Sequence, residues 1–140
     1  MKINNDCIYF RGDVPCKPHK EHGYHCSNCP EYKSFEQQIL IIKLGASGDV
    51  LRTTPILHHI KKAFPAAHIT WITKTIEFVP KSHVNTILQW NTDNILWLLA
   101  RKFDIIYSLD KDNEAIALAS RLQASTKKGY IMDEWGNCQP

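Results

Sequence analysis

The stretch Ile39-Leu40-Ile41-Ile42-Lys43-Leu44-Gly45-Ala46-Ser47-Gly48-Asp49-Val50-Leu51-Arg52-Thr53-Thr54-Pro55 decides the fold of this chain. Its first four residues are all apolar, a pattern typical of a strand buried on both faces of a parallel sheet. Small residues follow at 45–48, so a phosphate or a sugar could approach the backbone closely. The helix expected next would favour an anion at its N-terminus. Asp49 is therefore predicted to lie where parallel sheets bind ligands, beyond the carboxyl end of the first strand.

Apolar runs and helical patterns alternate through the rest of the chain, which predicts an α/β fold with a Rossmann-like parallel sheet and right-handed crossovers. The first helix is expected over 50–64, with Thr54 capping its regular part or Pro55 distorting its first turn. Further strands are expected over 69–73, 84–90, 103–109 and 128–132, and further helices over 94–101 and 113–123.

Residues 1–33 are predicted to be a separate, irregular unit in front of the lobe formed by residues 34–140. Gly or Pro residues interrupt this first segment every few positions, and neither helical nor strand periodicity is sustained. Such a segment cannot bury enough apolar surface to hold itself together, so a metal ion would supply the missing stability.

Cysteine and histidine residues make this first segment a candidate metal site. The spacing is Cys7-x8-Cys16-x9-Cys26-x2-Cys29, and its Cys-x2-Cys turn can present two thiolates to one ion. Four thiolates predict a structural zinc site. His19 or His25 could replace Cys7 or Cys16, an iron–sulfur cluster could use the same thiolates, and four free cysteines remain the plain alternative.

Composition limits the class of protein. The chain has 140 residues, 44% hydrophobic, which suits one ordinary packed domain. The net charge of +3 is scattered and forms no dense basic block, so it is only a weak argument for nucleic-acid binding. It is compatible with an anionic substrate or an acidic membrane surface, and no nucleic-acid partner is expected. The N-terminus lacks the apolar core of a signal peptide, so the cytoplasm is the expected compartment, where cysteines more often bind metal than form disulfides.

The quoted stretch resembles the start of the family 9 glycosyltransferases, the bacterial lipopolysaccharide heptosyltransferases. The resemblance rests on four segments and covers residues 39 to about 131. These segments are the strand Ile39–Ile42, the loop Gly48-Asp49-Val50, the helix start Thr53-Thr54-Pro55, and Ala63-Phe64-Pro65-Ala66-Ala67-His68-Ile69. A cysteine-rich leader also resembles one that precedes the first strand in a subset of this family.

The resemblance implies a GT-B enzyme of two Rossmann-like lobes, of which this chain would hold the N-terminal, acceptor-side lobe. The nucleotide-sugar lobe would be missing, as in a truncated form or a gene fragment, and the isolated chain is expected to be inactive. The implied reaction is the inverting transfer of a heptose from ADP-heptose to a lipopolysaccharide core or related glycolipid. The implied location is the cytoplasm, with peripheral contact to the inner membrane.

An inverting transfer needs a base to remove the proton of the acceptor hydroxyl, and Asp49 matches the family aspartate with that role. The alternative for Asp49 is a helix cap. The loop residues predicted to contact the acceptor or its phosphates are Lys43, Gly45, Ser47, Gly48, Arg52 and Thr53. Lys43 is equally well explained as a side chain that extends from the strand end to solvent.

A second hypothesis is a binding module without catalysis, in which a metal-stapled leader on a Rossmann-like lobe docks a partner. A flavodoxin-type nucleotide-binding protein is disfavoured, because the loop lacks a full phosphate-binding pattern and no helix closes the chain.

Overall fold

The computed structural model describes residues 2–34, 37–45 and 47–140, apart from the side chains of Ser47 and Asp49. The chain forms two compact units, which divide before Gln37. Ser34 was expected in the second unit, but its backbone bridges that of Cys7 within the first.

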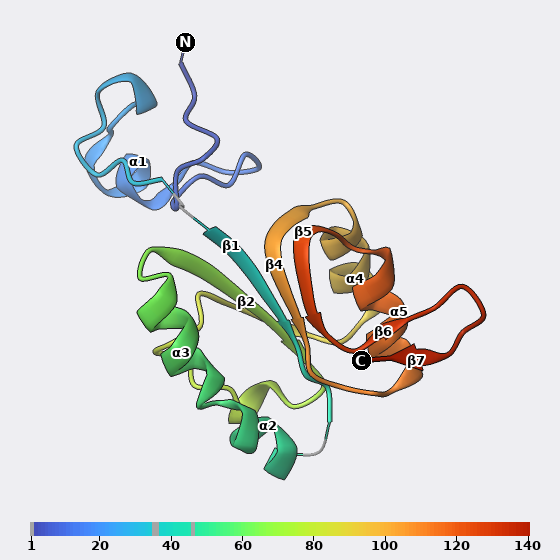
Figure 1. Ribbon diagram of the computed structural model, residues 1–140. Coiled ribbons are helices and arrows are strands. Elements are labelled where there is room, and N and C mark those ends of the chain that lie inside the picture. The colour runs from blue at the N-terminus through green and yellow to red at the C-terminus, as the bar shows by residue number, and fades with distance from the viewer. Residues whose placement is uncertain (1, 35–36, 46) are drawn as a thin grey trace. The chain divides into compact units, whose positions relative to one another are not determined.

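The second unit, residues 37–140, is built on a parallel five-stranded sheet with the order β3-β2-β1-β4-β5 (Figure 1). The predicted α/β, Rossmann-like fold is confirmed, and the first apolar run forms the central strand. The strands are β1 (Gln37–Ile42), β2 (Ala67–Thr73), β3 (Thr86–Gln89), β4 (Lys102–Ser108) and β5 (Gln123–Gly129).

Helices cover both faces of this sheet. Figure 1 shows α2 (Ser47–Thr53) and α3 (Ile56–Ala63) on one side, and α4 (Thr92–Leu99) and α5 (Asn113–Arg121) on the other. A short 3-10 helix, η2 (Ile76–Phe78), follows β2.

Alternate residues of β1 enter two apolar clusters, one on each face. Ile39 and Ile41 pack in the cluster that includes Val50 and Leu57, while Leu40 and Ile42 pack in the cluster that includes Leu98 and Ala115. All four β1 residues have no exposed surface. Each contributes about 1.5–3 kcal/mol by burial, so this strand stabilises the unit through both faces of the sheet.

The prediction of one helix over 50–64 is wrong, because the chain breaks at Thr54 and Pro55. Pro55 has no N–H to donate and precedes α3 as its N-cap residue, with φ −58°. Thr54 does not cap α3. Its hydroxyl donates to the carbonyl of Leu51 at 2.7 Å, within the end of α2.

The prediction for the last strand is also wrong: β5 begins at Gln123 instead of Lys128. This strand lies at an edge of the sheet, and its polar side chains are largely exposed. Gly129 ends it with φ +101°, where an added Cβ would lie 1.9 Å from the carbonyl oxygen of Ser108. No larger residue fits there without moving the backbone.

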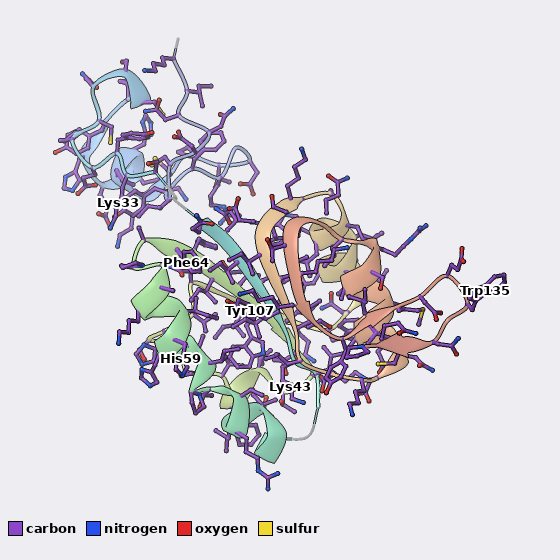
Figure 2. All side chains as sticks on the ribbon, in the orientation of Figure 1. Lys33, Lys43, His59, Phe64, Tyr107 and Trp135 are labelled. Atoms are coloured by element: carbon purple, nitrogen blue, oxygen red, sulfur yellow. The ribbon has the colours of Figure 1, made fainter. Side chains whose placement is uncertain are left out.

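An antiparallel hairpin follows β5, formed by β6 (Ile131–Met132) and β7 (Cys138–Gln139). The Asp133 carboxylate accepts hydrogen bonds from the backbone N–H groups of Trp135 and Asn137 and so shapes its turn. Trp135, at the tip in Figure 2, is 80% exposed.

The first unit, described over residues 2–34, contains only short helices. They are α1 (Lys17–His22), which ends at Gly23 with φ +71°, and the 3-10 helix η1 (Cys26–Asn28). Both apolar clusters lie in the other unit, and Pro18 is the one buried side chain among residues 2–34. No helix in the described parts of the chain is long and apolar enough to cross a membrane.

Candidate functional site

The candidate site lies at the carboxyl end of β1, where the chain reverses its direction across the sheet. From β1 the strand order proceeds outward through β2 and β3 on one side, and the chain then returns to β4 and β5 on the other. Crevices form where connections from neighbouring strands run to opposite faces, and ligands of open α/β sheets bind there. The loop after β1, predicted to be functional, begins at this point.

Asp110, directly after β4, holds the start of that loop. One carboxylate oxygen accepts a hydrogen bond from Nζ of Lys43 at 2.5 Å. The other accepts from the backbone N–H of Leu44 and, at 3.2 Å, from that of Gly45. Asp110 is only 6% exposed, so these three donors compensate a charge withdrawn from water.

Lys43, predicted to contact the acceptor or extend to solvent, is placed inside the unit. Its side chain is 11% exposed and is ion-paired with Asp110. Its carbonyl oxygen accepts a hydrogen bond of 3.4 Å from Nε1 of Trp71, which is fully buried. Figure 2 shows Lys43 at the lower end of β1, where the loop leaves the sheet. In this arrangement Lys43 helps to fix the start of the loop through its contacts with Asp110 and Trp71.

The side chains of the predicted residues Ser47 and Asp49 lie outside the described part of the structure, and so does the whole of Ala46. The backbone of Ser47 and Asp49 belongs to α2. Gly48 is exposed, and a Cβ added to it would contact nothing within 4 Å, so its backbone is open to an approaching group. Val50 is fully buried and anchors the first turn of α2 to the apolar cluster of that face.

The last two predicted loop residues lie at the end of α2. Thr53 donates its hydroxyl to the carbonyl of Val50 at 2.7 Å, so this group already has a partner within the helix. Arg52 is exposed in the last turn.

A second, exposed ion pair links the segment after β2 to the start of α5. Lys74 follows β2, and its Nζ lies 2.7 Å from a carboxylate oxygen of Glu114 in the first turn of α5. This hydrogen bond raises the pKa of Lys74 and lowers that of Glu114. Asp110 after β4 and Glu114 in α5 are thus each paired with a lysine that follows a strand, Lys43 after β1 and Lys74 after β2.

Asp110 was not predicted as a site residue. The available signal was its position, because a carboxylate directly after a buried strand lies at the ligand-binding edge of a parallel sheet. Its partners could not be deduced in advance, since they depend on β4 pairing with β1.

The four predicted metal ligands of the first unit line one small cavity. Cys7, Cys16, Cys26 and Cys29 are free, half-buried thiols. Together they contribute to a cavity of about 30 Å³. Nevertheless, the residues that the structure describes contain no group of three or more Cys, His, Asp or Glu side chains arranged to hold a metal ion. The predicted zinc site is therefore not supported as a preformed centre.

The two histidines predicted as alternative ligands lie beside a larger cavity of about 260 Å³. Nδ1 of His19 is 2.7 Å from the carbonyl oxygen of Tyr24, and the rings of His19 and His25 meet edge to face at 5.3 Å. Cys16 and Cys26 line this cavity too, whereas Cys7 and Cys29 line only the smaller one.

No protein-family model matches the chain, and no curated protein matches it. Solved structures do match. A family 9 glycosyl transferase from Veillonella parvula aligns with a TM-score of 0.53 and 24% identity, over 69% of this chain and 32% of that one. The heptosyltransferase WaaC of E. coli, solved with ADP, aligns with a TM-score of 0.55 and 24% identity, over 69% and 34%. The likeness confirms a fold shared with part of these glycosyltransferases, and the chain spans about a third of their length.

Proposed function

We propose that this chain is the acceptor-side lobe of a family 9 glycosyltransferase of the heptosyltransferase type. The observation that carries the proposal is the position of the loop after β1. This loop leaves the central strand where the chain reverses direction, and Asp110 fixes its first residues. The order of elements around it is the one expected from the sequence resemblance, and solved glycosyltransferases share the fold.

In the proposed reaction, Asp49 is the general base. Its carboxylate takes the proton of an acceptor hydroxyl while that oxygen attacks the anomeric carbon of the sugar. The bond from that carbon to the diphosphate breaks, ADP leaves with the electron pair, and the configuration at carbon inverts. A carboxylate suits this task because it is ionised at neutral pH, and the short Asp side chain is held close to its backbone.

The remaining loop residues would bind the acceptor. The open backbone at Gly48 allows close approach, and Arg52 offers a fork of donors to phosphate groups. Gly45 and Ser47 would line the same loop. Lys43 could reach a phosphate only by leaving Asp110, and Thr53 only by leaving Val50, so we assign both to support of the loop.

The donor proposed is ADP-heptose, and the acceptor is a lipopolysaccharide core or a related anionic glycolipid. This assignment is supported by the sequence resemblance and by the likeness to a heptosyltransferase solved with ADP. Such an acceptor would place the protein in the cytoplasm, in peripheral contact with the inner membrane. The sugar-nucleotide half of the reaction would need a second lobe.

The test compares the 140-residue chain with a form that also contains a nucleotide-sugar lobe. Both are incubated with ADP-heptose and a lipopolysaccharide core acceptor, and ADP release and the glycolipid product are followed. We expect no turnover from the chain alone and transfer from the two-lobe form. Asp49→Asn should lower kcat by about 10²–10⁴-fold without changing the free energy of unfolding.

Asp93→Asn is the matched control, because Asp93 also lies in the first turn of a helix, on α4. It should leave kcat unchanged. Turnover by the isolated chain would refute the expected inactivity. Full activity of Asp49→Asn would remove the catalytic assignment of Asp49. Absence of transfer by the two-lobe form would instead favour the binding module, which the separate cysteine-rich unit also suits.

A further inference from the structure

Four thiols that are distant in sequence share one cavity in the first unit. Cys7, Cys16, Cys26 and Cys29 line it, and four aromatic residues complete most of the wall: Tyr9, Phe10, Tyr24 and Tyr32. None of the four cysteines is in a disulfide. Soft thiolates in a mainly aromatic surrounding are a donor set for a soft metal ion rather than for a hard one.

Local backbone structure accounts for the position of each cysteine. Cys7 is bridged to Ser34, and the next residue, Ile8, donates its N–H to the carbonyl of Lys33 at 2.8 Å. Cys16 is the N-cap residue of α1. Cys26 begins the single turn of η1, and Cys29 directly follows it. The ends and the middle of the unit are thus brought to one cavity by hydrogen bonds that do not involve the thiols.

This unit lacks the usual source of stability. Among residues 2–34 only Pro18 is buried, and neither apolar cluster of the protein lies here. A segment of this size with so little core needs a cross-link or a metal ion to stay folded. The thiols are not cross-linked to one another, and four of them around one cavity are a ligand set for a metal ion.

We propose that the four cysteines close around a single zinc ion and that this closure stabilises the first unit. No three ligands are yet gathered in the described structure, so the site is completed by binding. Each thiol releases its proton to solvent as its sulfur bonds to Zn²⁺, and four thiolates leave the centre with two negative charges. The proposal does not depend on the glycosyltransferase assignment.

The arrangement of the ligands favours one of the alternatives. All four thiols lie on the wall of one small cavity, and four thiolates around a single ion are the usual ligand set of a closed structural zinc site. Of the alternative ligands, His19 is engaged with the Tyr24 carbonyl, and His19 and His25 line the larger cavity. The set of four cysteines is therefore favoured over sets with histidine.

The experiment measures metal and thiols in the full 140-residue chain, purified under reducing conditions. Elemental analysis is expected to give about one zinc per chain and no iron or acid-labile sulfide. Replacing zinc by cobalt should produce intense thiolate-to-cobalt absorption with tetrahedral bands. A chelator should abolish this absorption and make residues 2–34 sensitive to protease, while residues 37–140 stay resistant.

Variants separate the ligand sets. Cys7→Ser and Cys29→Ser should each lose most of the bound zinc, whereas the double variant His19→Ala/His25→Ala should retain it. Cys138→Ser is the matched control, because Cys138 is an exposed thiol of β7 in the other unit, and its zinc content should match the unmodified chain. Cobalt titration of chelated, refolded protein gives the same comparison if a serine variant does not fold during expression.

Three outcomes would overturn the proposal. Iron with sulfide in place of zinc would assign a cluster. Loss of zinc only in the histidine variant would assign the larger cavity. Four freely reactive thiols with no metal, together with a protease-resistant first unit after chelation, would show that the unit needs no ion.

Discussion

Residues 37–140 enclose two apolar clusters around a central strand, whereas residues 2–34 bury only Pro18 and place four thiols around a small cavity. The larger unit can therefore be stabilised by removal of apolar surface from water. The smaller one has little such surface to remove. The two units should therefore owe their stability to different interactions, the larger one to apolar burial and the smaller one to its thiols. Different substitutions or treatments should unfold each of them.

If burial stabilises the sheet unit, truncation of its largest buried side chain should have the largest effect. Trp71 is fully buried within the cluster beneath α2 and α3. We expect Trp71→Ala to lower the free energy of unfolding by about 4 kcal/mol. Urea unfolding followed by circular dichroism measures this. Tyr9→Ala, an exposed aromatic of the first unit, is the control and should leave that transition unchanged. A loss below about 1 kcal/mol for Trp71→Ala would contradict burial as the main source of stability.

The Asp110 carboxylate should be the next most sensitive group, since it serves three donors while buried. Asp110→Ala leaves the Lys43 ammonium and two backbone N–H groups without this acceptor, and we expect a loss of about 3 kcal/mol. Lys43→Met should cost less, about 1–2 kcal/mol, because the carboxylate keeps its backbone donors.

Hydrogen exchange locates the effect of these two variants. Exchange of the Leu44 and Gly45 amides should quicken strongly in Asp110→Ala and only slightly in Lys43→Met. If these amides exchanged equally fast in both variants, or faster in Lys43→Met, the ion pair would stabilise the loop more than the hydrogen bonds from its backbone to Asp110.

Burial in the sheet unit also acts on a titrating group. Burial, then the charges of Arg101 and Lys61, lower the pKa of His68 from 6.5 to about 4. The unfolded chain therefore binds more protons between these values, so stability falls as the pH drops from 6.5 to 4. Allowing for partial exposure of the ring, we expect the loss to be about 1–2 kcal/mol.

His68→Gln should remove this part of the pH dependence, because the amide can still bond to Thr86 but does not titrate. The measurement is urea unfolding at pH 4.5 and 7. His59→Gln serves as the control, since His59 is exposed on α3. The interpretation fails if the stability of both variants and of the unmodified chain falls equally.

The same contrast explains which parts of the fold the sequence predicts. The central strand was predictable because both faces of β1 are buried and its side chains are uniformly apolar. β5 was misplaced because an edge strand with exposed side chains needs no apolar pattern. The break between α2 and α3 was only partly foreseeable: Pro55 signals a disturbance, but its tertiary setting decides that the helix ends.

The candidate site divides in a similar way. The loop after β1 was identified from small residues that follow a buried strand, which is local information. Asp110 was missed because its role arises from pairing between strands that lie far apart in the sequence. The cysteines were recognised by type and spacing, yet their shared cavity depends on the bridge between Cys7 and Ser34.

The smallest effect should come from an ion pair that lies in the first unit. Nη2 of Arg11 lies 2.9 Å from Oδ2 of Asp13, but the two side chains are 64% and 61% exposed. The hydrogen bond from Arg11 lowers the pKa of Asp13, so any stabilisation exists above the ordinary Asp pKa and disappears as the pH falls through the lowered one. Water screens this pair, and we expect Arg11→Gln to leave unfolding of either unit unchanged at pH 7.

An NMR titration should still show that the pKa of Asp13 rises toward its ordinary value in Arg11→Gln. Lys43→Met is the buried counterpart and should change stability measurably. If Arg11→Gln destabilised the first unit as much as chelation of its metal, surface charge and not the thiols would hold that unit together.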